Sequence, residues 1–125
     1  MPKILVAEDE RDIRELIGFS LRFADFEVVL TQNGEEAIER ASVENPDLIL
    51  LDVRMPKMSG YEACRRLKED PPTRDIPIVF LSAKGQEREI EEGLDSGALD
   101  YIVKPFAPDD LADQVAEILR RMETR

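Results

Sequence analysis

Five short apolar runs recur along the chain, and each is separated from the next by a longer segment of mixed polarity. Several of the runs are continuous rather than alternating, which is typical of parallel strands that are covered on both faces. They occupy residues 4–7, 28–30, 48–51, 78–81 and 101–103. The pattern predicts five buried parallel strands.

The segments between the runs have helical periodicity. One helical face of the first segment carries these apolar side chains: Ile13, Leu16, Ile17, Leu21 and Ala24. The last segment has the same kind of face: Leu111, Val115, Ile118, Leu119 and Met122. The segment over residues 86–96 has few apolar positions and precedes Gly97, a residue type that favours helix ends.

Two polar residues predict where helices begin. Asn33 precedes Glu36 by three residues, and Ser59 precedes Glu62 by the same spacing. A short polar side chain at the start of a helix accepts a hydrogen bond from the backbone N–H three residues later. The second and third helices are therefore expected to begin just after Asn33 and Ser59.

Strict alternation of strands and helices predicts an α/β fold with a parallel sheet, right-handed crossovers and helices on both faces. Five strands favour the flavodoxin-like (βα)5 arrangement in the order 2-1-3-4-5, an order taken from proteins of that type rather than derived from these residues. We expect residues 1–125 to form a single domain. In this order, ligands bind beyond the carboxyl ends of the first and third strands.

The net charge of −11 and a pI near 4.5 argue against direct binding to nucleic acid, because neutralising phosphates supplies most non-specific affinity for it. No apolar run approaches the roughly 18 residues of a membrane span. The chain enters its first strand without a signal peptide, and its one cysteine, Cys64, suits a reducing compartment. A cytoplasmic location without membrane contact is expected.

Chemically reactive side chains follow four of the five apolar runs. Glu8 and Asp9 follow the first, Asp52 the third, Ser82 the fourth and Lys104 the fifth. Taken singly, an acidic residue at the end of a strand is more commonly part of a turn. A single serine there is more commonly hydrogen-bonded to nearby backbone, and a single lysine is more commonly a solvated charge. In the expected strand order, however, these ends are neighbours, so the five side chains should meet in one crevice.

Three carboxylates in one crevice repel each other unless a cation lies among them. Oxygen ligands favour Mg²⁺ over Zn²⁺, and the chain contains no histidine. Mg²⁺ held by carboxylates commonly takes phosphate oxygens as further ligands, and an aspartate can accept a phosphoryl group covalently. The chemistry expected at this edge is phosphoryl transfer.

The chain resembles the receiver domains of response regulators in two-component systems, including the stand-alone chemotaxis-regulator type. The motifs that carry the resemblance span essentially the whole chain: Glu8-Asp9, Leu-Leu-Asp52-Val-Arg-Met-Pro56 with Gly60, Leu-Ser82-Ala83-Lys, and Gly97-Ala-x-Asp-Tyr101-Ile-Val-Lys104-Pro105-Phe106. By this resemblance the chain is a cytoplasmic phosphoprotein of a phosphorelay. It would not be an enzyme beyond its own phosphorylation and autodephosphorylation.

The resemblance also implies roles for the residues at the sheet edge. Asp52 is the phosphoacceptor; Asp9, Asp52 and the backbone carbonyl of Arg54 hold Mg²⁺, and Glu8 acts mostly through water. The family often has aspartate at the position of Glu8. Ser82, the Ala83 N–H and Lys104 bind the phosphoryl group.

The switch implied by the resemblance involves Ser82 and Tyr101. Ser82 moves towards the phosphoryl group and Tyr101 swings into the vacated space, which changes the surface around the fourth helix, fifth strand and fifth helix. Arg54 and Lys84 match positions that tune self-dephosphorylation. Long cations there are expected to slow loss of the phosphoryl group, so Arg54→Ala and Lys84→Ala should change its half-life.

The implied partners are a sensor histidine kinase or phosphotransfer protein, contacted by residues 11–23, and a downstream protein target or effector domain. A dimer of the winged-helix transcription-factor type is not favoured, because the face that such regulators pair through is acidic. A stand-alone or relay role is preferred. The acids on that face are Glu89, Glu91, Glu92, Asp109, Asp110 and Asp113.

Three other functions remain as alternatives. A haloacid-dehalogenase-like phosphatase also uses an aspartate nucleophile, but it needs a second acid two residues later, where this chain has Arg54. A flavin-binding flavodoxin-like protein needs a phosphate-cradling loop where this chain has Glu8-Asp9-Glu10, and would be coloured. A receiver domain that is never phosphorylated would lack one or more of the acidic residues, Ser82 and Lys104, and this chain has all of them.

Overall fold

The computed structural model describes residues 1–83, 91, 97–104 and 107–123. Over residues 3–83 strands and helices alternate as the apolar pattern predicts, and one further strand and helix follow over residues 100–123. The strands are β1 (Lys3–Ala7), β2 (Glu27–Thr31), β3 (Leu48–Asp52), β4 (Ile78–Ala83) and β5 (Asp100–Lys104). The helices are α1 (Arg11–Phe23), α2 (Gly34–Glu44), α3 (Gly60–Glu69) and α5 (Pro108–Glu123). The helix expected over residues 86–96 lies outside the described residues.

The five strands form one parallel sheet in the order β2-β1-β3-β4-β5. The predicted flavodoxin-like fold is therefore confirmed, including its strand order. All five residues of β3 are buried, which explains why that run carries no polar residue before Asp52. This centrally placed strand is hydrogen-bonded to β1 on one side and to β4 on the other.

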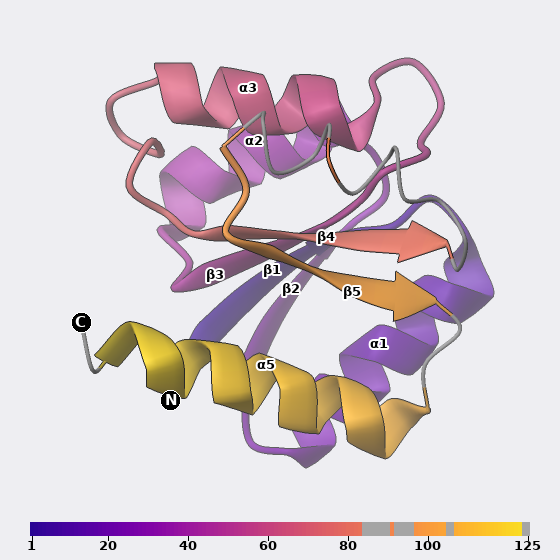
Figure 1. Cartoon of the computed structure of the whole chain (residues 1–125). Helices are drawn as coiled ribbons and strands as arrows, with labels where there is room; N and C mark the ends of the chain where they lie inside the picture. Colours follow the sequence, from indigo (N-terminus) through magenta and orange to yellow (C-terminus); the bar gives the residue numbers. More distant parts are fainter. Residues whose placement is uncertain (84–90, 92–96, 105–106, 124–125) are drawn as a thin grey trace.

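Helices cover both faces of the sheet, α2 and α3 on one and α1 and α5 on the other (Figure 1). Successive residues of a strand point to opposite faces, so Leu51 packs beneath α2 and α3 while Leu50 packs towards α1 and α5. Each face thus has its own apolar core, and β3 contributes to both.

The two predicted helix starts are confirmed. The Asn33 Oδ1 accepts a hydrogen bond of 2.8 Å from the Glu36 N–H, and the Ser59 Oγ accepts one of 3.2 Å from the Glu62 N–H. The Glu62 carboxylate also pairs with Arg66 at 3.0 Å. These caps fix the first turn of α2 and α3 with side chains that are local in sequence.

The inward face predicted for α1 is partly wrong. Ile17 and Leu21 are buried, but Leu16 is 40% exposed and Ala24 is also exposed. Leu16 instead lies on the outer side of the helix, which also carries the exposed side chains of Phe19 and Phe23. Among the helices in the described ranges, none has both the length and the apolar character needed to cross a membrane.

Candidate functional site: an acidic cleft at the carboxyl ends of the strands

Three carboxylates converge where β1 and β3 end. Glu8 and Asp9 directly follow β1, and Asp52 is the last residue of β3. Ligand oxygens from these three side chains all lie within 4.8 Å of one another. They line a cleft of about 270 Å³ together with Arg54 and Lys104. The sheet thus unites acids that are more than forty residues apart in sequence.

Lys104 reaches into the same cleft from the end of β5. Its Nζ lies 2.9 Å from Glu8 Oε2 and 3.1 Å from Asp52 Oδ2. Glu8 is only 1% exposed and Asp52 is 7% exposed, so the ammonium compensates charges that water barely reaches. The sequence predicted that Lys104 belongs to the crevice, but it did not predict this direct ion pair with Glu8.

The pKa of Glu8 reflects its burial. The pKa of Glu8 is raised to about 7, mainly by loss of water on burial; the hydrogen bond from Lys104 opposes this rise, and the charge of Asp52 adds to it. Burial by itself lowers the pKa of Lys104, but the hydrogen bond to Glu8 and the charge of Asp52 outweigh it, so that pKa lies above its ordinary value. Lys104 therefore stays positively charged, while Glu8 gains proton affinity.

Backbone and side-chain contacts hold the loop that carries Glu8 and Asp9. The Glu8 N–H donates to the Thr31 carbonyl at 3.1 Å, and the Glu10 N–H donates to Glu8 Oε1 at 3.3 Å. From α1, Arg14 Nη1 donates to the Glu8 carbonyl at 2.9 Å and to the Asp9 carbonyl at 3.3 Å. Sequence reasoning missed Arg14, because a lone arginine on a helix carries no motif signal.

The loop between β3 and α3 shapes the other wall of the cleft. The Arg54 N–H donates to Asp52 Oδ1 at 3.3 Å, and the Gly60 N–H donates to the Val53 carbonyl at 2.9 Å. A Cβ on Gly60 would lie inside van der Waals distance of the Asp52 carbonyl oxygen. Only glycine lets α3 begin so close to the end of β3.

The remaining predicted site residues fall into three groups. Ser82 is buried at the end of β4, and Ala83 pairs with Lys104 in the β4–β5 register. Tyr101 on β5 is 37% exposed, and Arg54 is exposed at the rim of the cleft. Lys84 lies outside the described residues. Their roles stay predictions.

The donor set fits a hard divalent cation. All three groups are carboxylates, and one of them, Asp9, is exposed. Glu8 is buried beside Asp52, so the negative charges of these two side chains are unfavourable unless a cation compensates them. Oxygen ligands with one side open to solvent suit Mg²⁺, which keeps several waters when a protein binds it. Asp9 and Asp52 would hold the ion, with Glu8 behind them.

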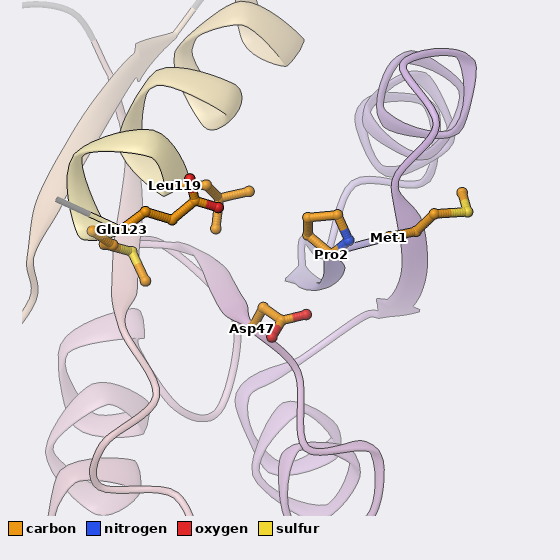
Figure 2. A pocket seen from close by; sticks show the side chains of 6 residues that line it. Met1, Pro2, Asp47, Leu119 and Glu123 are labelled. Atoms are coloured by element: carbon orange, nitrogen blue, oxygen red, sulfur yellow. The ribbon is translucent and has the colours of Figure 1, made fainter.

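A larger hollow of about 490 Å³ lies at the opposite edge of the sheet, before β1 and β3 begin. Figure 2 shows Pro2 and Asp47 on one side of it and Leu119 and Glu123 on the other, while the side chain of Met1 points away from α5. The Asp47 carboxylate is already engaged by the Lys3 N–H at 2.7 Å. This hollow brings together no set of reactive groups comparable to the acidic cleft.

The comparisons with known proteins agree with this geometry. Residues 4–116 match the model of the response regulator receiver domain. The phosphate regulon transcriptional regulatory protein PhoB of Rhizobium meliloti is 44% identical over 121 residues, covering 97% of this chain and 53% of that protein. The alkaline phosphatase synthesis transcriptional regulatory protein PhoP of Bacillus subtilis is 42% identical, with 97% and 50% covered. The chain spans about half the length of these curated relatives.

Solved structures lead to the same family. A putative response regulator from Chloroflexus aurantiacus matches with a TM-score of 0.89 and 34% identity, covering 95% of this chain and 98% of the other. The Vibrio cholerae chemotaxis protein CheY4 matches with a TM-score of 0.88 and 30% identity, with 94% and 98% covered. The family is regulatory rather than one of dedicated enzymes. With its acidic cleft, its strand order and these matches, the chain belongs to the response regulator receiver domain family.

Proposed function

We propose that residues 1–125 act as a single receiver domain in the cytoplasm, which accepts a phosphoryl group from a histidine kinase or phosphotransfer protein onto Asp52. The observation that carries the proposal is the convergence of the Glu8, Asp9 and Asp52 carboxylates within 4.8 Å, with Lys104 Nζ 3.1 Å from Asp52. Family membership supports it independently. The phosphatase alternative gains no support, because Arg54 occupies the position of its second acid.

The transfer step uses this chain's own residues for attack and for charge compensation. A carboxylate oxygen of Asp52 attacks phosphorus, the bond from phosphorus to the donor nitrogen breaks, and its electron pair stays on that nitrogen. The Lys104 ammonium then holds a phosphoryl oxygen, as do the Ser82 hydroxyl and the Ala83 N–H. Bound Mg²⁺ supplies further charge neutralisation for the phosphoryl oxygens.

Incubation with Mg²⁺ and acetyl phosphate tests the proposal. We expect one phosphoryl group per chain, stable to acid and labile to base, detected as a mass increase. Asp52→Asn should abolish it, and a chelator should prevent it, whereas Asp47→Asn, at the opposite edge of the sheet, should leave it unchanged. Phosphorylation that persists in Asp52→Asn would contradict the proposal.

The proposed switch moves Ser82 towards the phosphoryl group and Tyr101 into the fold. Before phosphorylation this switch requires an exposed Tyr101, and the side chain of Tyr101 is 37% exposed in the structure. Tyr61, the other tyrosine, is only 8% exposed. Acetylation of tyrosines by N-acetylimidazole, located by mass spectrometry, should therefore slow at Tyr101 when acetyl phosphate and Mg²⁺ are added. Tyr61 provides the unreactive internal reference. Equal rates at Tyr101 in both states would contradict the switch.

The proposed docking surface for the kinase is the outer side of α1. Phe19 and Phe23 are 67% and 79% exposed, and their stacked rings have centroids 6.2 Å apart. They border a hollow of about 420 Å³ that reaches Asp109 and Asp113 on α5. Phe19→Ser should lower phosphotransfer from a histidine kinase about tenfold, within the range for apolar anchors in interfaces. Phosphorylation by acetyl phosphate should not change, since that donor needs no docking surface.

A further inference from the structure

We infer that Arg14 is a positioning residue for the acidic cleft: its guanidinium clamps the backbone carbonyls of Glu8 and Asp9, and so sets the direction of both carboxylates. The inference rests on the proposed function, since it concerns the carboxylates that would hold Mg²⁺. Its basis is a pair of contacts from one nitrogen, Arg14 Nη1, to the Glu8 carbonyl at 2.9 Å and the Asp9 carbonyl at 3.3 Å.

The geometry suits arginine in particular. Each terminal guanidinium nitrogen carries two N–H groups in a fixed plane, so one nitrogen can donate to two acceptors at once. Arg14 begins the second turn of α1 and is only partly exposed, and its own N–H donates to the Glu10 carbonyl at 2.9 Å. The side chain therefore reaches back over the loop from a helix whose start is anchored to that same loop.

Asp9 is the residue that most needs this clamp. Its side chain is exposed, and within the described ranges no hydrogen bond or ion pair restrains its carboxylate. Glu8, by contrast, is held by Lys104 at 2.9 Å and by the Glu10 N–H at 3.3 Å. The backbone of Asp9 must therefore define where its oxygens point, and the backbone is what Arg14 contacts.

A simple charge argument gives the opposite expectation. Arg14 is a cation close to a cluster that would bind another cation, so its removal should tighten Mg²⁺ binding by lowering repulsion. A clamp that orients the carboxylates predicts weaker binding on its removal instead. Residues that orient metal ligands typically contribute about 10–100-fold to metal affinity. The sign of the change in Mg²⁺ affinity therefore separates positioning from bulk electrostatics.

The test compares Arg14→Met with Arg11→Met in the full chain. Arg11 lies on the same helix and carries the same charge, but it pairs with Glu15 at 3.2 Å, away from the loop. Mg²⁺ is titrated into unphosphorylated protein, and its dissociation constant is read from backbone amide shifts. We expect Arg14→Met to weaken Mg²⁺ binding about tenfold, and Arg11→Met to change it less than about twofold.

A third variant and a metal-free measurement complete the design. Arg14→Lys keeps the charge with one compact ammonium that can reach a carbonyl, so it should recover part of the affinity. Without Mg²⁺, amide hydrogen exchange at Glu10 should accelerate in Arg14→Met and not in Arg11→Met, since the Glu10 N–H bonds to Glu8 in the clamped loop. Melting temperatures of all variants report whether the fold persists.

The outcomes separate the inference from the function it rests on. Unchanged or tighter Mg²⁺ binding in Arg14→Met, with binding intact in the wild-type protein, overturns the positioning role. Wild-type protein that binds no Mg²⁺ overturns the proposed function, and the exchange rate at Glu10 then still decides whether Arg14 orders the loop. Equal loss of affinity in Arg11→Met and Arg14→Met would show that the effect does not come from the contacts of Arg14 with the loop, and would also overturn the inference.

Discussion

At the scale of single residues, the cleft is defined by a buried acid that is not the proposed phosphoacceptor. Glu8 is 1% exposed and its carboxylate is shared between Lys104 and the Glu10 N–H. The sequence located Glu8 correctly at the end of the first strand but could not predict its burial or the pairing with Lys104. Those depend on how five strands are aligned, which no local pattern encodes.

The raised pKa of Glu8 makes stability depend on pH. Its pKa is about 7 in the folded protein and 4.5 in the unfolded chain, so between these values the folded state binds more protons than the unfolded state. Stability of the metal-free protein should therefore fall as pH rises from about 4.5 to about 7, by at most about 3 kcal/mol. Urea unfolding at several pH values, with a chelator present, measures this.

Glu8→Gln is the matched control for that prediction. The amide retains the shape of the side chain but does not titrate, so the slope between pH 4.5 and 7 should flatten in this variant. Mg²⁺ should stabilise wild-type protein more at pH 8 than at pH 5, since a cation binds the deprotonated acids. A slope that is the same in both proteins would show that other acids, not Glu8, cause it.

At the scale of secondary structure elements, the close approach of α3 to the end of β3 shapes the cleft. The residues that predicted the helix start, Ser59 and Glu62, are local in sequence, and the cap was therefore predictable. The contact between Gly60 and the Asp52 backbone was not, although the glycine itself was part of the recognised motif. A glycine in a sequence indicates that the backbone needs conformational freedom or close packing, but it does not indicate which neighbouring atom a side chain would contact.

Gly60→Ala tests that contact. Its Cβ would meet the Asp52 carbonyl and come within 3.0 Å of Val53 Cα, and both are backbone atoms that cannot rotate away. We expect a loss of about 2–3 kcal/mol in the free energy of unfolding, measured by urea titration. Gly34→Ala is the control, since its nearest neighbour is the Met58 side chain, which can adapt. Equal losses in both variants would contradict the special role of Gly60.

At the scale of the whole molecule, one central strand joins two apolar cores. The alternation of strand and helix was sufficient to predict the sheet and the two helical layers, because the five apolar runs and the face of α5 were read correctly. The outer side of α1 was misread at Leu16, because a helical face of apolar residues does not reveal how much of it the partner elements cover.

Leu50→Ala and Leu51→Ala should show that the two cores unfold together. Leu50 packs on the α1 and α5 side and Leu51 on the α2 and α3 side, and both are fully buried. Each substitution should cost about 3 kcal/mol by leaving a cavity, with a single urea transition in circular dichroism. Val43→Ala, at a position 76% exposed, is the control and should change little. Two separate transitions in either leucine variant would refute joint unfolding.

The hollow at the amino-terminal edge of the sheet has a practical use. Met1 and Pro2 border it together with Leu119 and Glu123, so residue 1 and the end of α5 lie near each other, at the opposite edge of the sheet from the acidic cleft (Figure 1). A tag or a biosensor surface attached through either of these places leaves the acidic cleft facing the solution. Kinase-binding measurements on immobilised protein should therefore match those made in free solution.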